Sequence, residues 1–263
     1  MNSDTKKIVK QYENFNQVFD KSYVGIPKGY GGLEKKFIGY MDDFIKKYPK
    51  FNPKEKIPTV LYMHGSGDFI RGDTYREWIS GDLGFAFICP QSHILKNRPT
   101  YISPAPKKQY KKVHKLRQAE IKYSSKKIRK IEWIDKKNLF LMGNSEGALA
   151  TGIYPGDEFK ARIILAWSCE DGYYSQHTHI GSSKHEPILS VIGTEDEYFG
   201  VNSKFINSKK HKIRGHCIEA LLEHENSKVV VLPKTKHNLT DNPYTKHEII
   251  NFLQFWSEST CES

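Results

Sequence analysis

The stretch Asn138-Leu-Phe-Leu-Met-Gly-Asn-Ser145-Glu-Gly147-Ala-Leu-Ala150 decides which fold the sequence encodes. Its first part, Asn138–Met142, is a short apolar run with the length and composition of a buried strand. The residues from Gly147 onward are small and apolar and predict a helix. Ser145 stands in the tight turn between the two. A strand, a turn and a helix in direct succession favour a sheet with helices packed against it.

Further short apolar runs lie on both sides of this stretch, each bounded by glycine, proline or charged residues. The predicted strands are Thr59–Met63, Phe85–Cys89, Ala161–Trp167, Ile188–Ile192 and Lys228–Leu232. The predicted helices are Tyr110–Ile134, Gly147–Gly152, Cys217–His224 and Thr245–Trp256. This alternation is typical of an α/β protein with a mostly parallel sheet and helices on both faces.

The 263 residues fit one α/β domain, and no repeat or linker divides them. Residues 1–50 are either an N-terminal extension or early strands, with Phe37–Met41 expected as an antiparallel strand. Hydrophobic residues make up 38% of the chain, enough for a substantial core, so disorder is not expected.

Neither a membrane span nor a secretory signal is expected. No apolar run reaches the about eighteen residues that a transmembrane helix needs, and Met1–Lys10 lacks the apolar segment of a signal peptide. We therefore expect a cytoplasmic protein. The alternative is a periplasmic or secreted protein whose leader has been removed.

The net charge of +11 comes largely from lysines between Lys107 and Lys137. Such a segment indicates either a surface for nucleic acid or a solvated helix face. It lacks interleaved stacking aromatics, and the chain has no zinc-finger or phosphate-binding loop motif. We therefore expect a solvated face and no nucleic-acid partner.

The four cysteines are too few and too scattered for a disulfide scaffold. Cys89 lies within a predicted strand and is expected in the core. Cys169 and Cys217 could meet in space, and the sequence leaves open whether they form a disulfide.

Ser145 carries the strongest chemical signal, because it is the centre of a Gly-x-Ser-x-Gly pattern between a strand and a helix. A serine on such a turn has a strained backbone that exposes its hydroxyl as a nucleophile. Gly143 and Gly147 avoid clashes where neighbouring backbone comes close. The alternative interpretation is a helix N-cap serine between two turn glycines.

A nucleophilic serine needs donors for the oxyanion that forms on the substrate. The strand Thr59–Met63 leads into His64-Gly-Ser66-Gly-Asp68. The backbone N–H groups of Ser66 and Glu146 are predicted to face the developing charge. Glycines on either side of Ser66 are expected to let this loop turn. The alternative is a plain strand-to-loop turn, and His64 is expected to be structural.

An orienting acid and a base are expected after later strands. Glu195, Asp196 and Glu197 follow the strand Ile188–Ile192, and the Gly-x-x-Asp spacing favours Asp196, with Glu195 as the alternative. His237 follows the strand Lys228–Leu232. The order serine, aspartate, histidine is the one this architecture uses. His237 would take the Ser145 proton, and Asp196 would stabilise the imidazolium.

Together these motifs resemble the dienelactone-hydrolase-like branch of the α/β-hydrolase superfamily from about Pro58 to Trp256. The resemblance is carried by His64-Gly-Ser-Gly67, Arg117-Gln-Ala-Glu-Ile121, Trp133-Ile-Asp135, Leu139–Gly147, Ala166-Trp-Ser-Cys169, Gly193-Thr-Glu-Asp196 and Lys236-His237. It implies the α/β-hydrolase fold with a sheet of about eight strands and the triad Ser145, Asp196 and His237. Dienelactone hydrolase itself has a cysteine nucleophile, so Ser145 suggests an ordinary carboxylic ester as substrate.

The sequence therefore predicts a carboxylesterase-like serine hydrolase without a cofactor. The segment between Ser168 and His185 is too short for a large lid, which favours a small or polar ester, with Tyr173 and Tyr174 as pocket residues. His177, His179 and His185 lack the carboxylate pattern of a metal site, and no metal is expected. A serine peptidase of the same fold and a non-catalytic binding protein with a basic face remain the alternatives. The oligomeric state is not predicted.

Overall fold

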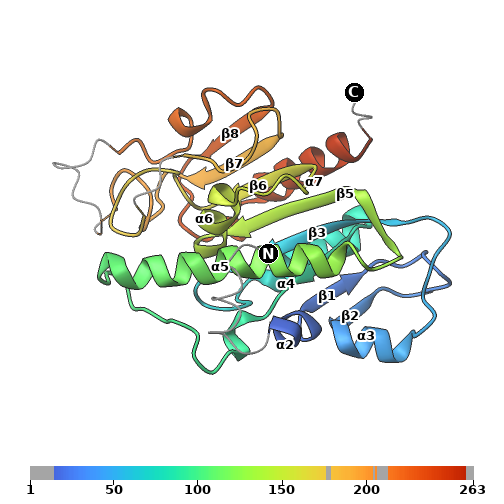
Figure 1. Ribbon diagram of the computed structural model, residues 1–263. Helices are drawn as coiled ribbons and strands as arrows, with labels where there is room; N and C mark the ends of the chain where they lie inside the picture. Colours follow the sequence, from blue (N-terminus) through green and yellow to red (C-terminus); the bar gives the residue numbers. More distant parts are fainter. Residues whose placement is uncertain (1–14, 176–178, 204, 206–212, 259–263) are drawn as a thin grey trace.

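The computed structural model describes residues 15–175, 179–203, 205 and 213–258. Its named strands form one eight-stranded sheet in the order β2-β1-β4-β3-β5-β6-β7-β8 (Figure 1). The strands are β1 (Tyr23–Ile26), β2 (Phe37–Tyr40), β3 (Ile57–Met63), β4 (Ala86–Cys89), β5 (Ile134–Asn144), β6 (Ala161–Leu165), β7 (Ile188–Gly193) and β8 (Ser227–Leu232). The helices are α2 (Phe15–Asp20), α3 (Met41–Lys47), α4 (Gly72–Arg76), α5 (Lys107–Ile128), α6 (Glu146–Ile153) and α7 (Pro243–Glu258).

Strands β3 to β8 are mutually parallel, whereas β1 is antiparallel to both β2 and β4. Helices cover both faces of the parallel strands, and both sides of each strand are therefore apolar. Successive residues of β3 point to opposite sides. Leu61 joins the core on one face, and Tyr62 joins the core on the other.

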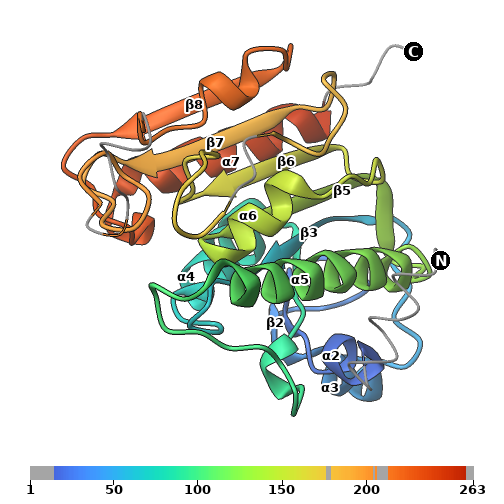
Figure 2. The same cartoon turned by 60° about the vertical axis from the view of Figure 1, so that its left-hand side comes forward.

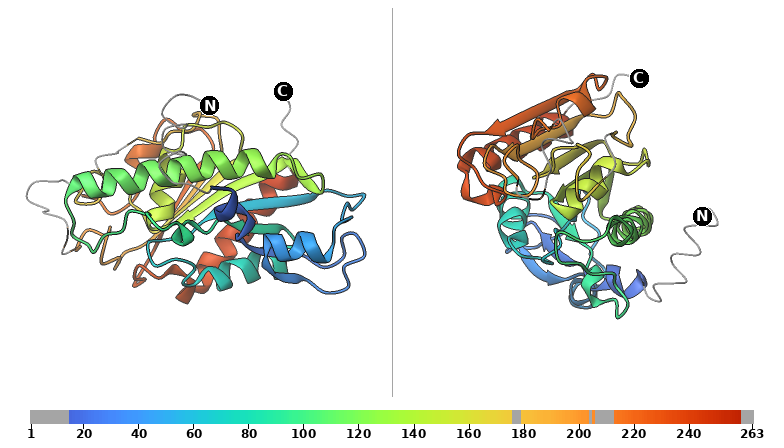
Figure 3. Two further views of the ribbon diagram at one scale, coloured as in Figure 1. Left: turned by 60° about the horizontal axis from the view of Figure 1, so that its bottom comes forward. Right: turned by 90° about the vertical axis from the view of Figure 1, so that its left-hand side faces the viewer.

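Helices α3, α5 and α6 cover one face of the sheet. Helices α4 and α7 and the π-helical turn Glu77–Leu83 cover the other (Figures 2 and 3). On the first face Phe44, Ile121 and Ala150 pack against the strands. On the second, Tyr75 and Leu253 do so. Since all parallel strands end at the same edge, the loops that follow them gather there.

The predicted strands, including the antiparallel one at residues 37–40, are confirmed. The predicted end of the helix Tyr110–Ile134 was wrong, because α5 stops at Ile128. Ile134 instead starts β5 and pairs with Ile57, whose N–H donates to the Trp133 carbonyl at 2.9 Å. The apolar spacing of the helix continues into this strand, so periodicity alone did not reveal the boundary.

The helix predicted over Cys217–His224 was also wrong. Only a 3-10 turn, Glu219–Leu221, forms there. An isolated helix of this length is marginal. In addition, a disulfide to Cys169 restrains the first residue of the segment.

Along α5, Lys108, Lys111, Lys112 and Lys115 are exposed, whereas Val113 and other apolar residues are buried. The lysine run therefore lies on a solvated face of this helix. Cys89 is fully buried in β4, as expected. Within the described ranges, no helix has both the length and the apolar character needed to cross a bilayer.

Candidate active site

The three predicted catalytic side chains meet at the carboxyl edge of the sheet. Ser145 follows β5, Asp196 follows β7 and His237 follows β8. The His237 Nε2 atom lies 2.9 Å from Ser145 Oγ, and its Nδ1 atom lies 2.8 Å from Asp196 Oδ2. The imidazole thus bridges a hydroxyl and a carboxylate, an arrangement that can move a proton away from the serine.

The backbone of Ser145 is in a strained conformation, with φ 56° and ψ −115°. Its N–H donates to the Leu165 carbonyl at 2.9 Å, and its carbonyl accepts from the Leu149 N–H at 3.1 Å. These bonds hold the turn from both sides and compensate for the strain. The Ser145 side chain makes no capping hydrogen bond to α6 and faces His237 instead, so the N-cap interpretation does not describe its geometry.

Gly143 and Gly147 are required by close backbone contacts. A Cβ added at Gly147 would lie 1.9 Å from the Met63 carbonyl oxygen, and one at Gly143 would lie 2.2 Å from the Gly147 carbonyl oxygen. Neither distance is possible for a real side chain. The glycine pattern therefore reflects how tightly α6 and the turn pack against β3.

Asp196 is fully buried and uses both carboxylate oxygens. Its Oδ1 accepts the backbone N–H groups of Tyr198 and Phe199 at 2.8 and 2.9 Å, which leaves Oδ2 for His237. Glu195 and Glu197 are exposed, and Glu197 accepts the backbone N–H of His237 at 3.0 Å. Of the three neighbouring carboxylates, it is therefore Asp196 that pairs with the imidazole.

The loop after β3 lies against the serine turn. An ideal Cβ at Gly65 would be 3.5 Å from Ser145 Cβ. Gly65 and Asp68 form an isolated bridge, with Ser66 and Gly67 in the turn between them. Neither Gly65 nor Gly67 has a positive φ, and Asp68, at φ 65°, is the left-handed residue. Asp68 holds this conformation while its Oδ1 accepts a hydrogen bond from Gln91 at 2.7 Å.

A buried ionic network next to this loop was not predicted. Glu146 Oε1 accepts from Arg98 at 2.5 Å and lies 3.5 Å from Arg117 Nε, while Oε2 accepts from the Tyr101 hydroxyl at 2.9 Å. Arg117 also donates to Glu120 at 2.5 Å. One sequence feature indicates this network. Arg117 and Glu120 have the i,i+3 spacing of a helical ion pair and lie among the apolar residues of that helix.

His64 is buried and structural, as expected. It accepts an Arg117 N–H at Nε2 (3.2 Å) and donates from Nδ1 to the Gly65 carbonyl (2.7 Å). Burial, together with the nearby Arg117 charge, holds the pKa of His64 well below its usual value. The imidazole is therefore neutral, and both of its nitrogens are occupied.

Polar atoms of His64, Asp68 and His93 come within 4.8 Å of one another, the spacing of a metal site. They do not suit a cation, because the two His64 nitrogens are engaged and the Arg98 and Arg117 charges are close. Of the histidines considered from the sequence, His179 and His185 are exposed, and His185 pairs with Glu225. His177 lies outside the described residues.

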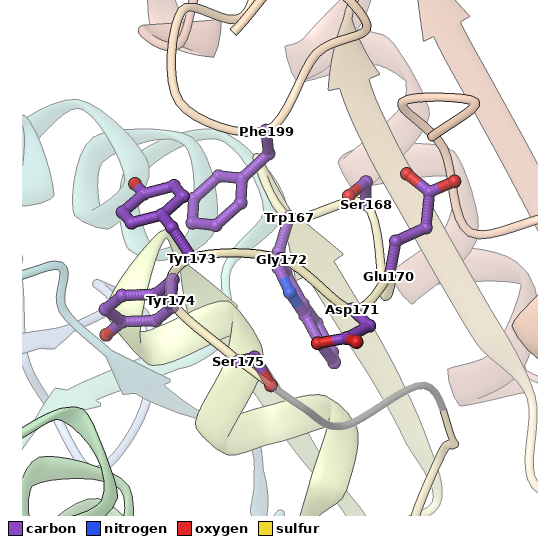
Figure 4. A pocket seen from close by; sticks show the side chains of 9 residues that line it. All are labelled: Trp167, Ser168, Glu170, Asp171, Gly172, Tyr173, Tyr174, Ser175 and Phe199. Carbon is purple, nitrogen blue, oxygen red and sulfur yellow. The ribbon is translucent and has the colours of Figure 1, made fainter. Parts of the chain in front are cut away.

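Tyr173 and Tyr174 line a small cavity of about 10 Å³ together with Trp167 and Phe199 (Figure 4). The Phe199 ring lies 5.8 Å from the His237 ring, centre to centre, so one residue of the cavity wall adjoins the imidazole. The Tyr174 hydroxyl is 3.0 Å from that of Tyr101. The cavity wall is thus aromatic and linked to the ionic network.

The loop that carries these tyrosines is fastened at its start. Cys169 and Cys217 form a disulfide. The next residue, Glu170, accepts the backbone N–H groups of Arg214 and Gly215 at 2.6 and 2.9 Å. A covalent bond and two hydrogen bonds therefore join the cavity loop to the segment before η3, the 3-10 turn at Glu219–Leu221.

No family model and no curated protein matches this sequence. Solved structures do match. Protein TT1662 from Thermus thermophilus has a TM-score of 0.56 at 16% identity, over 80% of this chain and 92% of that one. A candidate dienelactone hydrolase from Klebsiella pneumoniae matches with a TM-score of 0.55 at 15% identity, over 79% of this chain and 90% of that one. A phospholipase/carboxylesterase from Dyadobacter fermentans matches with a TM-score of 0.53 at 16% identity, over 76% of this chain and 91% of that one. This chain therefore has the α/β-hydrolase fold.

Proposed function

We propose that the chain is a serine hydrolase that cleaves small or polar carboxylic esters through an acyl-enzyme on Ser145. The observation that carries this proposal is the position of the His237 imidazole, 2.9 Å from the Ser145 hydroxyl and 2.8 Å from the Asp196 carboxylate. The similarity in fold to a phospholipase/carboxylesterase is in keeping with it.

In the first half-reaction His237 Nε2 removes the hydroxyl proton while Ser145 Oγ bonds to the ester carbonyl carbon. The backbone N–H groups of Ser66 and Glu146 stabilise the resulting oxyanion. The C–O bond to the alcohol then breaks, and the alcohol leaves with the proton from His237. Water repeats the sequence on the acyl-enzyme and releases the acid. Asp196 holds the imidazole in orientation and stabilises its charged form.

A small cavity with Phe199 in its wall supports a short acyl or alcohol group. This cavity has a volume of about 10 Å³, about enough for one water molecule. Four aromatic side chains line it, and Tyr198, outside its lining, packs edge-on against the His237 ring at 4.7 Å. We therefore propose that esters with small groups react faster than esters of long fatty acids.

The direct test is labelling with a fluorophosphonate, which phosphonylates an activated serine. Wild-type protein and a His247→Ala variant should label, because His247 is an exposed residue of α7. The Ser145→Ala and His237→Ala variants should not. Labelling that persists in folded Ser145→Ala would overturn the proposal.

The alternatives predict other outcomes. An esterase should hydrolyse p-nitrophenyl acetate faster than p-nitrophenyl octanoate and leave peptide p-nitroanilides intact. Rapid cleavage of the anilides would indicate a peptidase. Salt-sensitive retention on DNA by a protein that fails to label would indicate a binding protein that uses its basic face.

The disulfide bears on the compartment. Structural disulfides persist in oxidising environments and are rare in the cytosol. The Cys169–Cys217 bridge thus favours the periplasmic or secreted alternative over the cytoplasm. Maleimide-polyethylene glycol added after denaturation to protein trapped in acid should modify two thiols, Cys89 and Cys261, whereas modification of all four cysteines would indicate a reducing compartment.

A further inference from the structure

We propose that the buried carboxylate of Glu146 is a positioning residue, which with Arg98 and Arg117 sets the relative position of the two oxyanion-hole amides. This inference rests on the proposed function. The backbone N–H of Glu146 is one of those amides, and its side chain is fully buried. A single residue therefore contributes both a donor and the anchor for that donor.

Arg117 connects the two halves of the hole. Its Nη2 donates to the His64 carbonyl at 2.8 Å, and its Nη1 donates to the His64 ring at 3.2 Å. Its Nε lies 3.5 Å from Glu146 Oε1. His64 begins the loop that holds Ser66. One fully buried guanidinium thus joins that loop to the first residue of α6.

Arg98 and Tyr101 hold Glu146 from the other side. Arg98 Nη2 donates to Oε1 at 2.5 Å, and its Nε donates to Ser92 Oγ at 3.2 Å. Ser92 Oγ also accepts from Arg117 at 2.9 Å, so the two guanidinium groups that face Glu146 share one hydroxyl. The Tyr101 hydroxyl donates to Oε2 at 2.9 Å. Arg98 and Tyr101 therefore each hold one oxygen of the Glu146 carboxylate.

The network suits a positioning role because buried charged groups hold the Glu146 carboxylate from more than one side. Two buried guanidinium groups face the carboxylates of Glu146 and Glu120. Bonds to charged groups are short and directional. An oxyanion hole accelerates a reaction only when its donors are already aimed at the charge before it develops. A misplacement of about 1 Å lowers rates by roughly 100-fold.

Glu146→Leu tests the inference, since leucine keeps the bulk and helix preference but removes both acceptor oxygens. We expect kcat on p-nitrophenyl acetate to fall about 10- to 100-fold with KM within about threefold. Glu146→Gln retains one acceptor oxygen and should have an intermediate kcat. The matched control is Glu186→Leu, which removes the partner of buried Arg162 near the opposite end of β6 and should lower Tm without lowering kcat.

A transition-state analogue separates positioning from general damage. A trifluoromethyl ketone forms a tetrahedral oxyanion on the serine, so its Ki should rise by the same factor by which kcat/KM falls. Where Glu146→Leu does not fold, Arg98→Met with Glu146→Leu removes both opposite charges, and the same kinetic losses are expected in that variant.

The possible failures are distinguishable. If wild-type protein labels with fluorophosphonate while the folded Glu146 variants keep wild-type kcat and Ki, Glu146 only stabilises the fold and this inference is wrong. If wild-type protein neither labels nor hydrolyses esters, the proposed function fails, and this inference fails with it.

Discussion

The α-carbon of Gly147 faces the carbonyl oxygen of Met63 so closely that a methyl group on it would lie 1.9 Å from that oxygen. Strand β3 and helix α6 therefore touch through backbone next to the Ser66 loop and the Ser145 turn. This contact places the Ser66 loop beside the turn that carries Ser145, and it depends on the absence of a single side chain.

Gly147→Ala should accordingly separate β3 from α6 and both destabilise the protein and abolish ester hydrolysis. The displaced groups are backbone atoms of a central strand, which cannot move aside as a flexible side chain would. Thermal unfolding and kcat measure the two effects. At Gly65 a Cβ would meet nothing closer than 3.5 Å, so Gly65→Ala should keep a near-native Tm. Equal Tm values for the two variants would contradict this account.

Asp196→Asn should lower kcat by roughly 10³- to 10⁴-fold while the fold is kept. The asparagine oxygen can still accept from Tyr198 and Phe199, and its NH₂ group would then face His237 Nδ1. The imidazole then carries its proton on Nε2, and a protonated Nε2 cannot accept the proton of the serine hydroxyl. Glu195→Gln, at an exposed position, is the control and should retain kcat within about twofold. The reverse result would identify Glu195 as the acid.

Removing the disulfide with Cys169→Ser and Cys217→Ser together should lower the free energy of unfolding by roughly 2–4 kcal/mol, because the bridge closes a long loop. Urea unfolding with and without dithiothreitol measures this loss. The reductant should weaken wild-type protein to the level of the double variant and leave the variant unchanged. The prediction would be contradicted if the wild-type protein had the same free energy of unfolding with and without dithiothreitol.

Glu120 should make stability depend on pH. Burial raises its pKa to about 7 from an ordinary 4.5, against the lowering effect of Arg117. Between pH 4.5 and about pH 7, Glu120 therefore keeps its proton in the folded chain and releases it in the unfolded chain. The stabilisation is complete below about pH 4.5 and is lost as the pH rises through about 7. Relative to wild type, Glu120→Gln should therefore gain in Tm between pH 5 and pH 8. A Tm difference constant over this range would contradict the assignment.

Much of the fold could be predicted because its strands are short apolar runs that end in glycine, proline or charge. The misplaced boundaries have local causes. The apolar spacing of α5 runs on through Ile131 toward Ile134, and only the pairing of Ile134 with Ile57 ends the helix before it. Such a contact joins residues far apart in the chain, so a local pattern does not contain it.

The candidate triad could be predicted since each member follows a recognisable strand in a fixed order. The ionic network could not. Arg98 lies in a long loop with no periodic pattern, and Glu146 was considered only for its backbone N–H. Buried charges are stabilised by partners from distant segments, here a loop, α5 and the serine turn. Their sequence spacing therefore carries little information about the contact.

The hydrogen bond between Tyr174 and Tyr101 has a consequence for laboratory evolution of this chain. Tyr174 forms part of the cavity wall, and Tyr101 binds the Glu146 carboxylate. Shrinking Tyr174 to admit a bulkier ester would therefore also loosen the support of the serine turn, so broader selectivity at this position would come with slower turnover. Phe199 lines the same cavity, but its ring lies 5.8 Å from the His237 ring, so a smaller residue there would also change the packing of the imidazole.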